Sequence, residues 1–433
     1  MRIRLYNARI LTMLDGDIVR TGEIWICNTK IEKVYWSDKS NEIQDEMFDQ
    51  QIDCMGNLLM PGFKNGHAHG PMTFLRSFAD DLPLQEWLNQ KIFPAEALIT
   101  AEDIYVLMQL AILEYIRGGI TTSFEMYFHH DMIAKACIDL GFRVVLSGTV
   151  TGMEEQVDDA IALLKNDFAK FSDMHPLVNY KFGYHSEYSC CKALLEQIAR
   201  LCDAYQEPVY MHNSETKREV EECVKRYGVT PIQLMDSLGM FTNGGAGHHM
   251  VVTDEKDREI LKNRNVYVVT NPSSNLKLAS GIAPIREYVN FGIPVAIGTD
   301  GPASNNSLNF FKEMYLTTCL QKVKYEDAAA LSPFEVLKMA TVNGARMLGL
   351  TECDGIAEGK QADLIMIDLL KPNMQPMNHI INNLVYSGST DNVIMTMIAG
   401  RILYVNGKYC VDVDPLEIYQ RANLIIRRIE CSL

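Results

Sequence analysis

Residues 61–69 read Pro-Gly-Phe-Lys-Asn-Gly-His-Ala-His and follow the apolar run Leu58-Leu59-Met60. The apolar run predicts a buried strand, and His67 and His69 stand where that strand should end. Residues i and i+2 of a strand point to the same face, so both imidazoles can reach one cation. Imidazole nitrogen suits zinc, iron or nickel. The alternative is a pair of histidines in a surface turn, and residues further along the chain argue against it.

The sequence beyond this segment repeats a short apolar strand followed by an amphipathic helix. Eight such units over about 290 residues match the size of a (β/α)₈ TIM-type barrel, which we predict for residues 59–351. An open doubly wound sheet is the main alternative, but no G-x-G-x-x-G motif follows the first strand. The predicted strands are 58–63, 121–127, 143–150, 178–184, 208–211, 245–248, 266–270 and 294–299, and predicted helices include 101–117, 192–205 and 255–263.

The two ends of the chain are rich in β-forming residues. Short runs at 3–13, 23–36 and 51–54, and again at 362–368, 392–398 and 401–405, are separated by turn residues. The pair Asn406-Gly407 is a strong hairpin signal. We therefore predict a small discontinuous β-sandwich domain formed by residues 1–58 and 352–433.

Composition excludes several classes of function. The net charge of −15 argues against nucleic acid as a partner, because phosphate binding favours a basic face. No apolar run reaches the length of about 18 residues that a membrane span needs. The N-terminus lacks the apolar core of a signal peptide. The 11 cysteines include no C-x-x-C pair, which predicts reduced thiols in the cytoplasm.

Chemically reactive residues recur where the predicted barrel strands end. Active sites of such barrels form at the carboxyl ends of the strands. Six of the ten histidines fall there, and chance scattering would place several in helices and distant loops. The residues at these ends are His67, His69, His185, the run His212-Asn213-Ser214-Glu215, the pair His248-His249, and Asp300.

These residues suit hydrolysis assisted by one divalent metal. His67, His69 and His212 offer neutral nitrogen ligands, and Asp300 offers a hard oxygen. Such a site leaves a position for water, whose pKa bound zinc lowers to about 7. Asp300 can also accept a proton from that water. Alone, however, Asp300 also fits an ordinary turn aspartate before glycine.

Two further residues suit proton transfer and charge stabilisation. Glu215 suits a general acid/base, although a carboxylate near a helix N-terminus is the simpler interpretation of that residue alone. His248 suits stabilisation of charge on the attacking oxygen. We interpret its neighbour His249 as a packing residue, and the spacing to Asp254 favours His248 as the one that faces the metal.

Longer segments extend this pattern to a known family. Pro61-Gly62, His67-Ala68-His69, His212 with Glu215, His248 and Gly298-Thr299-Asp300-Gly301 resemble the amidohydrolase superfamily. Residues 72–76 (Met-Thr-Phe-Leu-Arg), 79–84 (Ala-Asp-Asp-Leu-Pro-Leu), 271–281 and 300–306 resemble more closely the 5′-methylthioadenosine/S-adenosylhomocysteine deaminases and their triazine hydrolase relatives. The resemblance runs from about residue 55 to the end of the chain.

The resemblance implies roles for individual residues. It implies one zinc ion, or sometimes iron, bound by His67, His69, His212 and Asp300. It implies Glu215 as the proton shuttle and His248 as the residue that orients water. By matching motifs, Glu96 would bind ribose hydroxyls, His185 would contact the purine, and Trp87 and Ser304 would line the pocket.

One departure from the family narrows the expected substrate. Relatives that take S-adenosylhomocysteine carry arginines after the third strand, where residues 147–152 here read Ser-Gly-Thr-Val-Thr-Gly. Binding a carboxylate in a bidentate manner needs a guanidinium, so we expect 5′-methylthioadenosine, 5′-deoxyadenosine or adenosine to be preferred. The alternatives are a hydrolase of another N-heterocycle (triazine, guanine or pterin) and a catalytically silent metal-binding scaffold. By analogy we expect a homodimer or homotetramer with no nucleic-acid or membrane partner.

Overall fold

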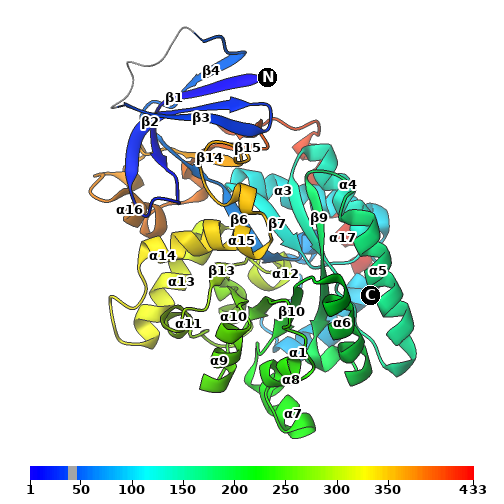
Figure 1. Ribbon diagram of the computed structural model, residues 1–433. Helices are drawn as coiled ribbons and strands as arrows, with labels where there is room; N and C mark the ends of the chain where they lie inside the picture. Colours follow the sequence, from blue (N-terminus) through cyan, green and yellow to red (C-terminus); the bar gives the residue numbers. More distant parts are fainter. Residues whose placement is uncertain (38–45) are drawn as a thin grey trace.

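Eight parallel strands form the central sheet of the protein (Figure 1). The computed structural model describes residues 1–37 and 46–433. The strands are hydrogen-bonded in chain order and almost every residue in them is buried, as expected for a sheet covered on both faces. They are β6 (Phe63–Ala68), β7 (Ile120–Glu125), β8 (Arg143–Ser147), β9 (Val178–Ser186), β10 (Val209–Asn213), β11 (Gly245–His249), β12 (Val266–Thr270) and β13 (Val295–Ile297).

The first and last strands meet and close the sheet into a barrel. The backbone N–H of Asp300 donates to the carbonyl of His67 at 3.0 Å, and Ala68 forms a parallel bridge with Asp300. The Asn65 side chain joins the same two segments, because it donates to Thr299 Oγ1 (2.7 Å) and accepts from the Thr299 N–H (2.9 Å). The predicted barrel is therefore confirmed.

Helices surround the barrel and follow most of its strands (Figure 1). Those at 101–117, 192–205 and 255–263 have the predicted bounds. The start of α3 is fixed by Thr100, which accepts from the N–H of Asp103 while its own N–H donates to that carboxylate. The helices that precede the last barrel strand, β13, are α1 (Leu84–Trp87), α2 (Phe93–Glu96), α3 (Ala101–Arg117), α4 (His130–Leu140), α5 (Val157–Phe171), α6 (Lys192–Tyr205), α7 (Lys217–Tyr227), α8 (Pro231–Ser237), α9 (Glu255–Asn263), α10 (Pro272–Lys277) and α11 (Ile285–Phe291).

Strands from both chain ends form a second, mixed sheet, which lies at the top of Figure 1. It has its own apolar core, which includes Leu5, Ile24, Leu59 and Met395. The Asn406-Gly407 hairpin is present between β16 and β17. The strands are β1 (Arg2–Leu11), β2 (Val19–Cys27), β3 (Lys30–Trp36), β4 (Gln50–Asp53), β5 (Leu58–Pro61), β14 (Leu364–Ile367), β15 (Val393–Ile398), β16 (Arg401–Val405) and β17 (Lys408–Tyr409).

The predicted strand 58–63 is in fact two strands of different sheets. β5 pairs with β1 and β14 in the mixed sheet, whereas β6 starts the barrel. The chain crosses between the sheets at Gly62, where an added Cβ would lie 2.1 Å from the Thr121 side chain. Only glycine allows this close approach.

The C-terminal segment contains helices as well as the predicted strands. Ile418, Ala422, Ile425 and Ile429 of α17 recur at helical spacing and belong to the main core around the barrel. The proposed domain division at residues 58 and 352 stays a prediction. The remaining helices are α12 (Pro302–Asn305), α13 (Phe310–Lys324), α14 (Pro333–Lys338), α15 (Gly344–Met347), α16 (Ile380–Tyr386) and α17 (Pro415–Glu430). Within the described residues no helix has the length and apolarity to cross a membrane.

Candidate active site

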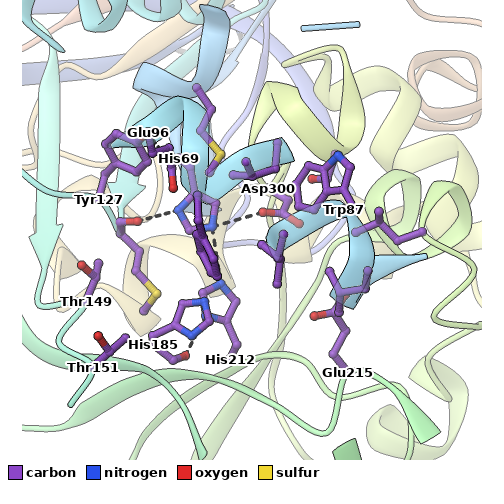
Figure 2. Close-up of a pocket in the computed structure, with 18 of the residues that line it drawn as sticks. His69, Trp87, Glu96, Tyr127, Thr149, Thr151, His185, His212, Glu215 and Asp300 are labelled. Atoms are coloured by element: carbon purple, nitrogen blue, oxygen red, sulfur yellow. Dashed lines mark hydrogen bonds and ion pairs between the residues drawn. The ribbon is translucent and has the colours of Figure 1, made fainter. Parts of the chain in front are cut away.

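A cavity of about 270 Å³ opens at the carboxyl ends of the barrel strands (Figure 2). Eight of the residues selected from the sequence line it, and they come from segments that are far apart in the chain. Below this cavity the barrel interior is filled by apolar side chains such as Phe124, Val145 and Val269, so the site has a closed floor. The eight lining residues are His69, Trp87, Glu96, His185, His212, Glu215, Asp300 and Ser304.

The predicted metal ligands converge on one point. Asp300 Oδ1 lies 3.5 Å from His67 Nε2 and 3.3 Å from His69 Nε2, and His69 Nε2 lies 3.4 Å from His212 Nε2. Two ligands of a tetrahedral zinc ion, each about 2.1 Å from the metal, lie about 3.4 Å apart. The spacing of these four side chains therefore fits a single zinc-sized cation.

Hydrogen bonds leave the Nε2 atoms of these histidines free to bind a metal. His212 Nδ1 lies 2.7 Å from the carbonyl oxygen of His185, and His69 Nδ1 contacts the carbonyl of Met126. A carbonyl can only accept, so each Nδ1 carries a proton, and Nε2 is the nitrogen left to face Asp300 or, in the neutral ring, to bind a metal. His67 is fully buried, its ring nitrogens meet no hydrogen-bond criterion within the described chain, and burial lowers its pKa to about 3. A neutral, unpartnered imidazole in a buried site is what a metal ligand requires.

Asp300 is held in position by its surroundings. Ser274 Oγ donates to Oδ2 at 2.6 Å, and the N–H of Gly301 donates to Oδ1 at 2.8 Å. Burial acts to raise the pKa of Asp300, but His67 and His69 hold it well below its usual range. Asp300 is therefore a carboxylate, and its φ of 59° places it in the left-handed region that often marks functional sites.

Glu215 is buried in the cavity wall and has few polar partners. Ser280 Oγ donates to its Oε1 at 3.0 Å, and His249 Nε2 lies 3.8 Å from its Oε2. Burial raises the pKa of Glu215 above its usual value. A carboxyl with a raised pKa near a metal site can both accept and return a proton at neutral pH.

His249, and not His248, lines the cavity, although we expected His248 to face the metal, and which of the two acts in catalysis stays a prediction. His249 Nε2 lies 3.9 Å from Asp300 Oδ2, while its Nδ1 lies 2.8 Å from the side-chain oxygen of Asn275. His248 stacks on His67 with ring centroids 3.9 Å apart, and in the described chain neither of its nitrogens has a partner. Strand alternation would point the His249 side chain away from the cavity. The backbone at His249 has a φ of 73°, and this turns the side chain toward the cavity instead.

The side chains expected to bind substrate lie around the rest of the cavity. Glu96 accepts a 2.5 Å hydrogen bond from the Tyr127 hydroxyl, and burial raises its pKa. His185 Nδ1 lies within 3.0 Å of the hydroxyls of Ser186 and Ser189, and burial lowers its pKa to about 4. In Figure 2 Glu96 and Tyr127 lie on the opposite side of the cavity from Glu215.

Sequence reasoning missed several supporting residues. Ser274, Asn275 and Ser280 contact Asp300, His249 and Glu215, and they lie in the polar run after β12 that resembles a simple turn. Tyr127 precedes two histidines in a loop, and no local pattern connects it with Glu96. For Ser274, Asn275 and Ser280, the available signal was the resemblance of residues 271–281 to the family.

Comparisons with known proteins agree with this geometry. The sequence pattern of the amidohydrolase family matches residues 58–403. A 5-methylthioadenosine/S-adenosylhomocysteine deaminase of Caldicellulosiruptor saccharolyticus is 39% identical and aligns over 100% of both chains. A 5′-deoxyadenosine deaminase of Methanobrevibacter smithii is 37% identical over 99% of this chain and 98% of its own. A crystal structure of an adenosine deaminase from Xanthomonas campestris with bound zinc superimposes with a TM-score of 0.93, at 32% identity, over 99% of this chain and 98% of that one. The chain therefore belongs to the amidohydrolase family of enzymes.

Proposed function

We propose that this amidohydrolase is a metal-dependent deaminase that converts an adenine nucleoside to the inosine analogue and releases ammonia. The observation that carries the proposal is the convergence of three Nε2 atoms and the Asp300 carboxylate, with Glu215 and His249 on the same wall. This set supplies a metal site, a proton shuttle and a charge stabiliser within one cavity. The names of the relatives point to the same reaction.

His67, His69, His212 and Asp300 would hold the metal, for which zinc is the best candidate because the donors are neutral nitrogens and one carboxylate. When bound, such an ion acts as a Lewis acid that lowers the pKa of water to about 7. Asp300 accepts a proton as water attacks C6 of the adenine ring. Glu215 places a proton on N1, and His249 hydrogen-bonds the attacking oxygen through Nε2. The proton on Asp300 then passes to the amino group and the proton of the new C6 hydroxyl returns to Glu215, so the C6–N bond breaks, ammonia leaves and both carboxylates recover their starting state.

The remaining lining residues support a nucleoside substrate whose 5′ group carries no carboxylate. Glu96, held by Tyr127, can accept hydrogen bonds from two ribose hydroxyls, while His185 contacts the purine and Trp87 and Ser304 shape the pocket. No lysine or arginine of the described chain lines the cavity. We propose 5′-methylthioadenosine, 5′-deoxyadenosine or adenosine as substrates in preference to S-adenosylhomocysteine.

The test is ammonia release from a panel of 5′-modified adenosines, with guanine and a triazine as ribose-free compounds and metal analysis alongside. We expect ammonia and the ultraviolet shift from adenine to hypoxanthine from the nucleosides only. Glu215→Gln should keep its zinc and lose about 10²–10⁴-fold in kcat, because the shuttle is removed while the ligands remain. Turnover near the wild-type rate in that variant, or a ribose-free compound as the best substrate, would contradict the proposal.

A further inference from the structure

A second cavity of about 640 Å³ adjoins the candidate active site and shares four wall residues with it: Tyr127, Phe128, Thr149 and Thr151. It lies between the loops that follow β7 and β8 and the outer helix α5. Figure 2 shows Tyr127, Thr149 and Thr151 on one side of the active-site cavity, away from Trp87 and Glu215. A substituent that leaves the active site past Tyr127 therefore enters this second space.

Tyr127 connects the second cavity with the ribose end of the proposed substrate. Its hydroxyl donates to Glu96, which is the residue proposed to hold the ribose hydroxyls. If adenine binds at the proposed metal site and ribose at Glu96, the 5′ carbon would be directed toward this shared wall. The second cavity is thus positioned for the group attached at the 5′ carbon.

The charged groups of this cavity are predominantly acidic. Asp131, Asp159 and Asp167 contribute to its walls, and no lysine or arginine among the described residues does so. Asp131 pairs with Lys170, and Asp167 lies 2.8 Å from His130 Nδ1. Within the described chain Asp159 has no ion-pair partner, so its carboxylate can pair with a ligand.

An independent feature also indicates a ligand here. Tyr180 lines the cavity and is 1% exposed, yet its hydroxyl has no hydrogen-bond partner in the described chain. A buried polar group without a partner is uncommon and calls for a bound molecule. Gly148 packs closely against this hydroxyl, because a Cβ there would lie 3.0 Å from it and 2.3 Å from Leu164.

We propose that this second cavity binds the 5′ substituent of the substrate and favours one that carries a positively charged amine. The proposal rests on the deaminase function proposed above. An alkylammonium group would donate to the Tyr180 hydroxyl and be attracted by Asp159, whereas a carboxylate would be repelled by the acidic wall. The reaction at C6 is unchanged, so the preference acts on substrate binding.

The test compares kcat/KM for adenosines that carry 5′-(3-aminopropylthio), 5′-propylthio and 5′-(2-carboxyethylthio) groups, with 5′-methylthioadenosine as reference. We expect the amine to exceed the neutral analogue about 5-fold or more and the carboxylate to fall below it by a similar factor, both through KM. Asp159→Asn and Tyr180→Phe should each reduce the preference for the amine about 3-fold. Asp158→Asn, which alters an adjacent exposed carboxylate outside the cavity wall, should leave it unchanged.

Two outcomes overturn the inference in distinguishable ways. If 5′-methylthioadenosine is deaminated but the three analogues do not differ, or Asp159→Asn and Asp158→Asn behave alike, the role of the second cavity is wrong and the deaminase function stands. If none of the four compounds releases ammonia, the proposed function fails and the inference fails with it.

Discussion

Single residues in the left-handed region set the direction of the key side chains. Ser214, His249 and Asp300 have φ values of 53°, 73° and 59°, and each lies at or just after the end of a barrel strand. Such conformations cost a non-glycine residue roughly 1 kcal/mol or more, so the surrounding contacts must hold them. At His249 and Asp300 this backbone conformation accompanies an imidazole and a carboxylate that line the cavity, and at Ser214 it directly precedes Glu215.

The assignment of His249 can be tested against its neighbour. His249→Asn should lower kcat by about 10²-fold, because it removes the Nε2 group that faces Asp300 and Glu215. His248→Phe should stay within a few-fold of wild type, because the stack on His67 is kept and no hydrogen bond is lost. Steady-state kinetics with zinc analysis measures both. The reverse order of effects would return the role to His248.

At the scale of elements, buried carboxylates on two helices and one strand fix the loops at the strand ends. Glu219 on α7 accepts from the backbone N–H groups of Ser214 and Glu215, at 2.7 and 2.8 Å, and thereby fixes the turn after β10. Burial and the nearby Glu215 raise the pKa of Glu219 to about 7. Glu125 at the end of strand β7 accepts from the backbone N–H of Gly70, and Glu313 on helix α13 accepts from that of Ser273. The site is therefore supported both from the helical layer and from the barrel sheet.

Glu219 should influence catalysis without contacting substrate. Glu219→Ala leaves two buried N–H groups without partners and should lower kcat about 10-fold, with a smaller change in KM and zinc content. Glu219→Gln keeps one acceptor and should fall between this variant and wild type. Glu221→Gln, on the exposed face of the same helix, is the matched control. Equal kinetics for Glu219→Ala and Glu221→Gln would show that the loop is held by other contacts.

At the scale of the whole molecule, a buried ion pair joins the barrel to the segment that enters the mixed sheet. Arg143 of β8 donates to both carboxylate oxygens of Asp363, at 2.8 and 3.1 Å. Burial opposes ionisation of Asp363, but Arg143 holds its pKa at about 2. The pair therefore stabilises the fold fully above about pH 4, and this contribution is lost as the pH falls toward 2.

Breaking this pair should destabilise the whole chain. Arg143→Ala leaves the Asp363 carboxylate buried and unpaired, which should cost about 3–5 kcal/mol of unfolding free energy at pH 7. Arg401→Ala, which removes a largely exposed arginine 3.6 Å from Asp412, should cost less than about 1 kcal/mol. Urea unfolding followed by circular dichroism measures both. A similar loss in the two variants would argue against a joining role for Arg143.

The sequence predicted the features that depend on local periodicity and chain order. Buried strands and amphipathic helices have clear patterns, and a barrel brings strand ends to one rim, so the position of His212 or Asp300 near the cavity follows from its place after a strand. The division between β5 and β6 depends on which distant strands pair, and the choice of His249 depends on the sign of one φ angle. Neither is encoded in the spacing of residues.

The junction between β6 and β13 has a consequence during synthesis of the protein. Asn65 and Thr299, which join across it, are 234 positions apart, and Asp300 is the last of the proposed metal ligands to be translated. A nascent polypeptide or a proteolytic fragment that stops earlier offers only the three proposed histidine ligands and lacks the Asp300 carboxylate. Full metal loading therefore requires that residue 300 has been translated and that the barrel has closed.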